Sequence, residues 1–337
     1  MNKIKNTLFS NKPVTIDENS LILALESSCD ETACAIVKGG REVLANVVAS
    51  QIKIHEEFGG VIPEIAAREH LEAVNIVVEE AFKQANVKPD DITAFAGTVG
   101  PGLVGCLLVG LNATKSLALA YDKPFIGVNH LIGHISANFI DTNLEPPFIA
   151  LLVSGGHTQI IDVKSYSELE IIGETIDDAV GEAYDKVARL IGLPYPGGPK
   201  LDKLAQIGNP HAFKLPEAKV EGYNFSFSGL KTAVLRLVKS FDGKEMPTND
   251  ICASFQECVS STLLKKVKKA LEEKQYKQVV LAGGVAANSE IRKKIFNLKN
   301  EGYEVFAPQM KYCTDNAAMI ASSAYFFDKT YDNIDVE

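Results

Sequence analysis

Short apolar runs alternate with amphipathic stretches along the chain. Apolar residues dominate residues 21–25, 33–37, 94–99 and 125–128, and each run is bounded by polar or turn-forming residues. Such short runs predict buried strands. Residues 63–84 and 103–121 have helical periodicity instead, and a further helix is expected around His130. The first half of the chain is therefore predicted to be an α/β region.

The second half begins like the first. Residues 148–153 and 159–163 predict two strands around a polar turn, as residues 21–25 and 33–37 do. Helices are predicted over residues 177–191, 230–240 and 251–274, and a strand over residues 278–282. Alternating strands and helices predict an α/β fold with helices on both faces of the sheet. Glu145-Pro146-Pro147 is the best linker candidate between the halves.

Composition narrows the class of protein. The 337 residues suffice for about two domains, and 46% hydrophobic and 23% charged residues are ordinary values for a soluble protein. A net charge of −9 disfavours a nucleic-acid binder that relies on bulk charge. Six cysteines without C-x-x-C spacing indicate reduced thiols in the cytoplasm. We expect neither a signal peptide nor a membrane-spanning segment.

His130 and His134 lie one helical turn apart, so both imidazoles can reach one metal ion. The alternative is a capping or core pair, with Asn129 capping the helix. A metal site needs a third ligand, for which the candidates are Glu26, Asp30, His157 and Asp315. No glutamate stands between the histidines, which disfavours a zinc protease of the H-E-x-x-H type.

Glycines follow two predicted strands, at Gly155-Gly156 and at Gly283-Gly284. They are either tight turns or loops whose amides approach a nucleotide, and neither matches a P-loop or G-x-G-x-x-G pattern. Asp178, Glu182 and Asp185 form an acidic stripe along one predicted helix, which is either a solvated face or part of a site. Asp185 and Asp202 also flank a Pro-Gly loop, which could present carboxylates to a ribose-like diol.

Basic clusters at residues 265–269 and 292–294 are either solvated helix surfaces or basic patches. Lys231 follows an aromatic and hydroxyl-rich segment, Phe225 to Gly229, and so stands in a more specific context.

Several motifs occur together and in order: Glu26 to Thr32, the histidine pair, Leu152 to Thr158, Asp177 to Asp185, Tyr195 to Pro199, Phe225 to Lys231 and Gly283 to Asn288. As a set they resemble the TsaD family, also called Gcp or YgjD, the tRNA N6-adenosine threonylcarbamoyltransferases. The resemblance covers residues 21–325. It implies a two-lobed actin-, Hsp70- and sugar-kinase-like fold with a nucleotide cleft between related lobes. We expect an N-terminal extension (1–20), an N-terminal lobe (21–145) and a C-terminal lobe (146–330).

The resemblance implies transfer of threonylcarbamoyl from threonylcarbamoyl-adenylate to N6 of adenosine 37 in tRNAs that read codons starting with A. It assigns one metal ion, iron or zinc, to His130, His134 and Asp315, and catalysis to Asp30 with Glu31 beside it. The residues it assigns to the adenylate donor are Val153, Ser154, Gly155, Gly156, His157, Asp185, Gly198, Asp202 and Asn288.

Besides tRNA, the implied partners are a TsaB-like paralogue, a TsaE-like ATPase and a TsaC-like synthase that supplies the donor, with ATP or ADP as a further ligand. Three other functions stay open: an endopeptidase acting on glycoproteins, an ATPase or small-molecule kinase of the same fold, and a nucleotide-binding scaffold.

Overall fold

The computed structural model describes residues 3–5 and 14–327. Its contacts divide the chain into two units. Unit 1 comprises Met1–Glu145, Ser165–Glu168 and Pro308–Glu337, and unit 2 comprises Pro146–Lys164 and Leu169–Ala307. The first boundary coincides with the expected linker. Residues 308–327, which we expected in the C-terminal lobe, instead return to unit 1.

Unit 1 is built on a five-stranded sheet of order β5-β4-β3-β6-β7. The first three strands in sequence pair antiparallel, and β6 and β7 then add in parallel to β3. The strands are β3 (Leu21–Glu26), β4 (Glu31–Lys38), β5 (Glu42–Ser50), β6 (Ala94–Gly100) and β7 (Phe125–Asn129). Glu26 ends β3 and Glu31 begins β4, so the acidic turn predicted from the sequence joins these two strands.

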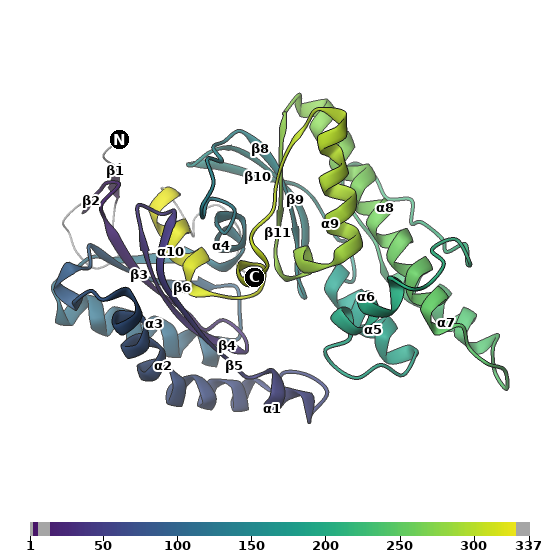
Figure 1. The fold of residues 1–337 in the computed structure, drawn as a ribbon, viewed down its shortest axis with the longest axis horizontal. Helices are drawn as coiled ribbons and strands as arrows, with labels where there is room; N and C mark the ends of the chain where they lie inside the picture. The colour runs from purple at the N-terminus through teal and green to yellow at the C-terminus, as the bar shows by residue number, and fades with distance from the viewer. Residues whose placement is uncertain (1–2, 6–13, 328–337) are drawn as a thin grey trace. The chain divides into compact units, whose positions relative to one another are not determined.

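Helices cover both faces of this sheet (Figure 1). One face packs on α2 (Pro63–Ala85) and α3 (Val104–Ala120), and its core includes Leu23, Val77 and Phe95. The other face packs on α4 (His130–Ser136) and on α10 (Ala317–Phe326), all of whose residues are buried. Because strand residues alternate between faces, a central strand covered on both sides reads as one continuous apolar run.

Unit 2 repeats this topology, with a sheet of order β10-β9-β8-β11-β12 in which β8 pairs antiparallel with β9 and parallel with β11. The strands are β8 (Phe148–Val153), β9 (Thr158–Ser165), β10 (Glu168–Glu174), β11 (Gln278–Ala282) and β12 (Glu304–Phe306). The matching strand orders confirm the prediction of two related α/β halves.

The helices of unit 2 are α5 (Val180–Leu190), α6 (Gly197–Ala205), α7 (Ser228–Lys239), α8 (Thr248–Lys274) and α9 (Ser289–Phe296). The prediction that a helix starts at Asp177 is wrong, because α5 begins at Val180. Asp178 therefore does not continue the helical stripe, although Lys186 pairs with it at 2.6 Å and with Glu182 at 2.7 Å. These ion pairs favour the solvated-face interpretation for Asp178 and Glu182.

The remaining elements are short. Of the expected N-terminal extension, β1 (Lys3–Lys5) and β2 (Val14–Ile16) pair antiparallel, and residues 6–13 lie outside the described part of the chain. Helix α1 (Ile52–Glu56) and four 3-10 turns complete the chain, namely η1 (Pro89–Asp91), η2 (Gly284–Ala287), η3 (Asn297–Glu301) and η4 (Met310–Tyr312). Among the described residues, no helix combines the length and apolar character needed to cross a bilayer.

Candidate active site

The histidine pair is positioned by the start of a capped helix. Asn129 ends β7, and its side chain accepts hydrogen bonds from the backbone N–H groups of Leu131 (2.8 Å) and Ile132 (3.3 Å), so α4 begins at His130. Asn129 therefore caps the helix, as the alternative interpretation supposed, but both histidine side chains are largely buried. Because α4 starts there, His130 and His134 lie one turn apart on the same side of the helix.

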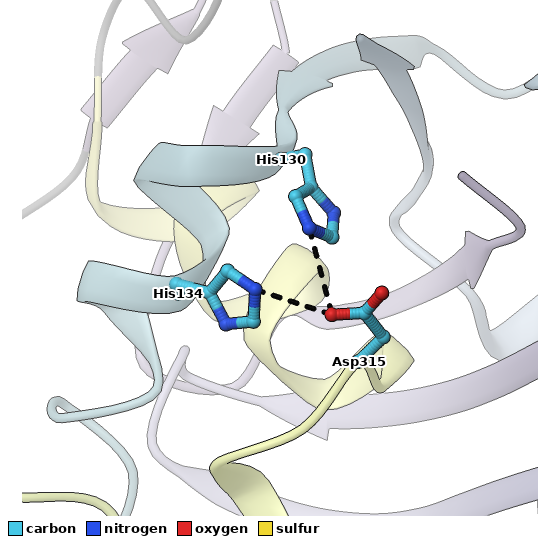
Figure 2. Close-up of side chains that lie close together, drawn as sticks. All are labelled: His130, His134 and Asp315. Atoms are coloured by element: carbon cyan, nitrogen blue, oxygen red, sulfur yellow. Dashed lines mark ion pairs between the residues drawn. The ribbon is translucent and has the colours of Figure 1, made fainter. Parts of the chain in front are cut away.

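Asp315 completes the cluster from the far end of the chain. It precedes Asn316, which caps α10 by accepting a hydrogen bond from the N–H of Met319 at 3.1 Å. Oδ1 of Asp315 lies 3.2 Å from Nε2 of His134 and 3.5 Å from Nε2 of His130. Figure 2 shows both rings directed at this carboxylate. Of the four candidates for a third ligand, Asp315 is the one that forms a convergent group with the histidines.

Glu26 holds His130 from its other side. Its Oε2 lies 3.2 Å from Nδ1 of His130 and accepts a hydrogen bond of 2.5 Å from Oγ1 of Thr98, while Oε1 accepts one of 2.6 Å from the N–H of Ser28. Glu26 is fully buried. A carboxylate on the outer nitrogen of a metal-binding histidine fixes its tautomer and orientation. Glu26 is therefore an outer support of His130. In the sequence, this role is indicated only by the position of Glu26 directly after the apolar run 21–25.

The electrostatics of the cluster suit a cation. Burial lowers the pKa of His130, but the negative charges of Asp315 and Glu26 outweigh burial and raise that pKa to about 9. Burial raises the pKa of Asp315, but the charge of His130 and the hydrogen bond from His134 bring it down to about 2. The two carboxylates thus favour positive charge at this site. The three ligand atoms lie within 4.8 Å of one another, and two imidazoles with one carboxylate are a donor set used for both iron and zinc.

Of the predicted catalytic acids, Asp30 lies on the turn between β3 and β4, and Glu31 begins β4. Burial, together with the charges of Asp30 and Asp315, raises the pKa of Glu31 to about 9, so these three carboxyl groups interact. The buried His70 supports the turn, with Nε2 lying 3.0 Å from the carbonyl oxygen of Cys29 and Nδ1 lying 2.7 Å from Oγ1 of Thr32. His70 escaped the sequence reasoning. Its position on the apolar side of the helix predicted over residues 63–84 could have indicated a buried polar role.

In unit 2 the two glycine junctions meet at one edge of the sheet. Strands β8 and β11 are parallel neighbours, so the residues after Val153 and Ala282 lie side by side. Gly283 has a φ of +90°, and a Cβ there would lie 2.3 Å from the carbonyl oxygen of Val153. Gly155 and Gly156 are exposed and have open space around them. The backbone at Gly155-Gly156 is therefore accessible. At Gly283, the backbone instead packs closely against the end of β8.

The other predicted donor residues have defined hydrogen bonds. Oδ1 of Asp185 accepts from the N–H groups of Gly197 (2.9 Å) and Gly198 (3.1 Å), at the start of α6. Asp202 accepts from the hydroxyl (2.6 Å) and the N–H (3.2 Å) of Ser289. Asn288 caps α9 through the N–H of Ile291 at 3.0 Å. The Pro-Gly loop is thus tied to α5, and the end of α6 is tied to the start of α9.

A pocket of about 650 Å³ borders this second cluster. It is lined by Gln256 and Ser289, which contact Asn288 and Asp202, and by Gln206, His211 and Lys293. None of the predicted donor residues lines it, so the pocket is adjacent to the predicted donor site rather than part of it.

The chain is similar in sequence to a known family and to several of its members. The sequence model of the family described as TsaD, tRNA N6-adenosine threonylcarbamoyltransferase, matches residues 42–322. The chain is 55% identical over 312 residues to the tRNA N6-adenosine threonylcarbamoyltransferase of Clostridium perfringens strain SM101, covering 91% of this chain and 92% of that protein. It is 54% identical over 315 residues to the enzyme of the same name from Clostridium botulinum strain 657, covering 92% and 93%.

Solved structures support the fold. HypF of T. kodakarensis superposes with a TM-score of 0.64 at 14% identity, covering 95% of this chain and 50% of HypF, so the chain spans about half of that protein. Component A of the Acidaminococcus fermentans (R)-2-hydroxyglutaryl-CoA dehydratase superposes with a TM-score of 0.52 at 18% identity, covering 91% and 97%. At these identities the likeness concerns the actin-like fold alone. The family match and the two clostridial relatives together show that this chain belongs to the TsaD family of tRNA N6-adenosine threonylcarbamoyltransferases.

Proposed function

We propose that this transferase, which acts on tRNA, uses threonylcarbamoyl-adenylate as donor and adenosine 37 of tRNAs reading A-starting codons as acceptor, with the help of one metal ion. The observation that supports the metal ion is that Nε2 of His130 and Nε2 of His134 both face Oδ1 of Asp315. Either iron(II) or zinc would fit this donor set. When bound, the ion would supply positive charge that neutralises the charged groups of the donor.

Unit 2 supplies the donor-binding residues in this proposal. Within the predicted segment Val153 to His157, the exposed Gly155 and Gly156 offer backbone N–H groups to donor oxygens, as glycine turns do for anions. Among the described residues, Oδ2 of Asp185 has no hydrogen-bond partner, while Oδ1 caps α6, so Oδ2 is available to a ribose hydroxyl. Asp202 and Asn288, which fix the start of α9, position the remaining contacts to the adenylate.

The chemical step is an acyl transfer. N6 of the adenosine attacks the carbamoyl carbon, the bond from that carbon to the adenylate oxygen breaks, and AMP leaves. The proton from N6 passes to Asp30, with Glu31 orienting the amine. Because adenylate is a good leaving group, positioning and charge stabilisation suffice without a covalent nucleophile.

The test is mass analysis of tRNA nucleosides after incubation of the protein and its partners with donor and unmodified tRNA. Asp30→Ala should lower the transfer rate, and His134→Ala should lower both metal content and transfer. Asp242→Ala and His211→Ala, which change exposed residues of the same types, serve as matched controls. Normal transfer by the Asp30 variant would exclude Asp30 as the base. Normal transfer by His134→Ala protein that contains no metal would exclude a role for the metal ion in the reaction.

The three other functions can be tested on the same samples. The segment between the histidines contains Leu131, Ile132 and Gly133, which leaves a protease without the glutamate that activates water in H-E-x-x-H enzymes. Glycoprotein cleavage lost in His130→Ala would favour a peptidase. Phosphoryl transfer from ATP without tRNA would favour a kinase or ATPase, and unchanged tRNA modification in catalytic variants would favour a scaffold.

We further propose that the neighbouring helices α2 and α3 bind a TsaB-like paralogue, and that TsaE-like and TsaC-like proteins complete the system in the cytoplasm. Large apolar side chains are exposed on these helices: Leu71, Ile76, Val104, Leu108 and Leu119. Large exposed apolar side chains on two helices that pack on each other favour an interaction surface. Leu108→Lys should abolish complex formation in size-exclusion chromatography, whereas Ile207→Lys, an exposed apolar site on unit 2, should not.

A further inference from the structure

Helix α7 (Ser228–Lys239) exposes cations and hydroxyls without any acid. Its sequence, SGLKTAVLRLVK, contains three basic residues and no aspartate or glutamate. Leu230 and Val234 are buried, whereas Thr232, Arg236 and Lys239 are exposed and Lys231 lies at the edge of the exposed side. In a chain with a net charge of −9, this face is a local exception.

The lysines of α8 and α9 differ because their charges are compensated. Lys265 pairs with Glu217 at 2.9 Å, Lys268 with Glu301 at 2.6 Å, and Lys294 with Glu257 at 2.6 Å. By contrast, within residues 3–5 and 14–327, no acid forms an ion pair with Lys231, Arg236 or Lys239. Most lysines of the clusters that are densest in the sequence are thus paired with carboxylates, and the sparser cations of α7 keep their charge available.

A single carboxylate fixes where α7 begins. Oδ1 of Asp177 accepts hydrogen bonds from the N–H groups of Phe227 (2.8 Å) and Ser228 (3.3 Å), and Oδ2 accepts from the hydroxyls of Ser226 (2.5 Å) and Ser228 (2.7 Å). The buried rings of Phe225 and Phe227 stack beneath this turn with centroids 6.0 Å apart. Because Asp177 already satisfies the start of the helix, any anion bound by α7 must meet its basic side rather than its N-terminus.

We propose that the side of α7 bearing Lys231, Arg236 and Lys239 binds phosphates of the tRNA acceptor. The inference rests on the proposed function and adds to it a location for the RNA contact. Cations and hydroxyls are the side chains that contact phosphate oxygens, and they position an RNA without reading its sequence. Asp177 and the aromatic pair hold the start of the helix that carries these groups, so the backbone need not be ordered on binding.

The test compares two variants of equal charge change in the full-length protein. One carries Lys231→Gln, Arg236→Gln and Lys239→Gln, and the other carries Lys265→Gln, Lys268→Gln and Lys269→Gln on α8. Affinity for unmodified tRNA is measured by fluorescence anisotropy over a range of KCl concentrations, with and without the partner proteins. The α7 variant should bind roughly tenfold more weakly, and its salt slope should fall by about 1 for each phosphate that the helix no longer binds.

The α8 variant should keep the wild-type slope, since its lysines are already paired. Equal slopes for the wild type and the α7 variant, or equal losses of affinity in both variants, would overturn the proposal. So would an α7 defect confined to partner binding, which would indicate an acidic protein surface instead. Donor binding without tRNA should be unchanged in both variants. If the wild-type protein itself fails to modify tRNA, the proposed function fails, whereas normal modification and RNA binding by the α7 variant refutes this inference alone.

Discussion

Glu26 and Asp315 hold the His130 ring from opposite nitrogens, with Oε2 of Glu26 3.2 Å from Nδ1 and Oδ1 of Asp315 3.5 Å from Nε2. The first contact leaves Nε2 as the nitrogen directed toward Asp315 and His134. Glu26 itself is fixed by Thr98 and by the backbone of Ser28, so its position does not depend on a bound ion.

Replacing Glu26 by Gln should weaken metal binding about 10- to 100-fold without changing the ligand set, because His130 loses a charged hydrogen-bond partner. Competition with a chromogenic chelator measures this affinity for iron(II) or zinc. Glu72→Gln, on the exposed side of α2, is the matched control. An unchanged dissociation constant in the Glu26 variant would show that His130 needs no outer support.

Metal should also stabilise the fold, because Asp315 and the histidines belong to segments joined by the packing of α4 on α10. At a free metal concentration of about 100 times Kd, the free energy of unfolding should rise by about 2.7 kcal/mol. Thermal or urea unfolding with and without chelator tests this. In Asp315→Asn the stabilisation should disappear, and a gain equal to that of the wild type would place the ion elsewhere.

The sequence predicts the central strands of both units and β7, together with the turns that carry the chemistry, because continuous apolar runs ending in glycines or acids have few other structural solutions. The edge strands β5, β10 and β12 escaped prediction, because they are only partly buried. From residues alone the third metal ligand stayed open among four candidates, and the family resemblance selected Asp315. Its position depends on the docking of α10, and α10 is apolar on every side, so helical period gives no facing direction. Likewise, Lys268 finds its partner in Glu301, a tertiary pairing that local sequence does not encode.

Asp177 should stabilise the protein in a pH-dependent way. Burial raises the pKa of Asp177, but hydrogen bonds from Ser226, Ser228 and Phe227 outweigh burial and lower that pKa below its usual value. The stabilisation is therefore complete above the unfolded-state pKa, near 3.9, and is lost as the pH falls through the lower folded-state value. Urea unfolding of the wild type and Asp177→Asn should differ at neutral pH and converge in acid. A constant difference across this range would exclude the carboxylate's charge as the cause.

Arg41 should be a major source of stability in unit 1. Its guanidinium donates hydrogen bonds to the carbonyl oxygens of Phe139 (3.0 Å), Thr142 (2.5 Å) and Leu144 (3.0 Å), and lies 4.6 Å from the ring centroid of Phe326. Arg41→Met should lower the free energy of unfolding by about 3 kcal/mol, since it leaves these carbonyl groups without their donor. Lys53→Met, at an exposed site, should change it by less than about 0.5 kcal/mol.

Gly283 and Gly284 form a matched pair of positions. At Gly283 an alanine must adopt a φ of +90° and place its Cβ against the carbonyl oxygen of Val153, whereas Gly284 has open space and an ordinary φ. Gly283→Ala should lower the free energy of unfolding by about 1–3 kcal/mol and weaken donor binding, because it displaces the end of β8. Gly284→Ala should do neither. Isothermal titration with a non-hydrolysable donor analogue, together with urea unfolding, distinguishes the two.

The return of the chain to unit 1 at Pro308 affects how the protein is made. Asp315 and α10 are synthesised after all of unit 2, yet α10 covers one face of the unit 1 sheet. During translation, domains normally fold in order from the N-terminus. Here the first unit stays open on one face until the ribosome has passed the second. The nascent chain therefore cannot assemble the His130–His134–Asp315 group early, and the proposed uptake of a metal ion would be one of the last events of biosynthesis.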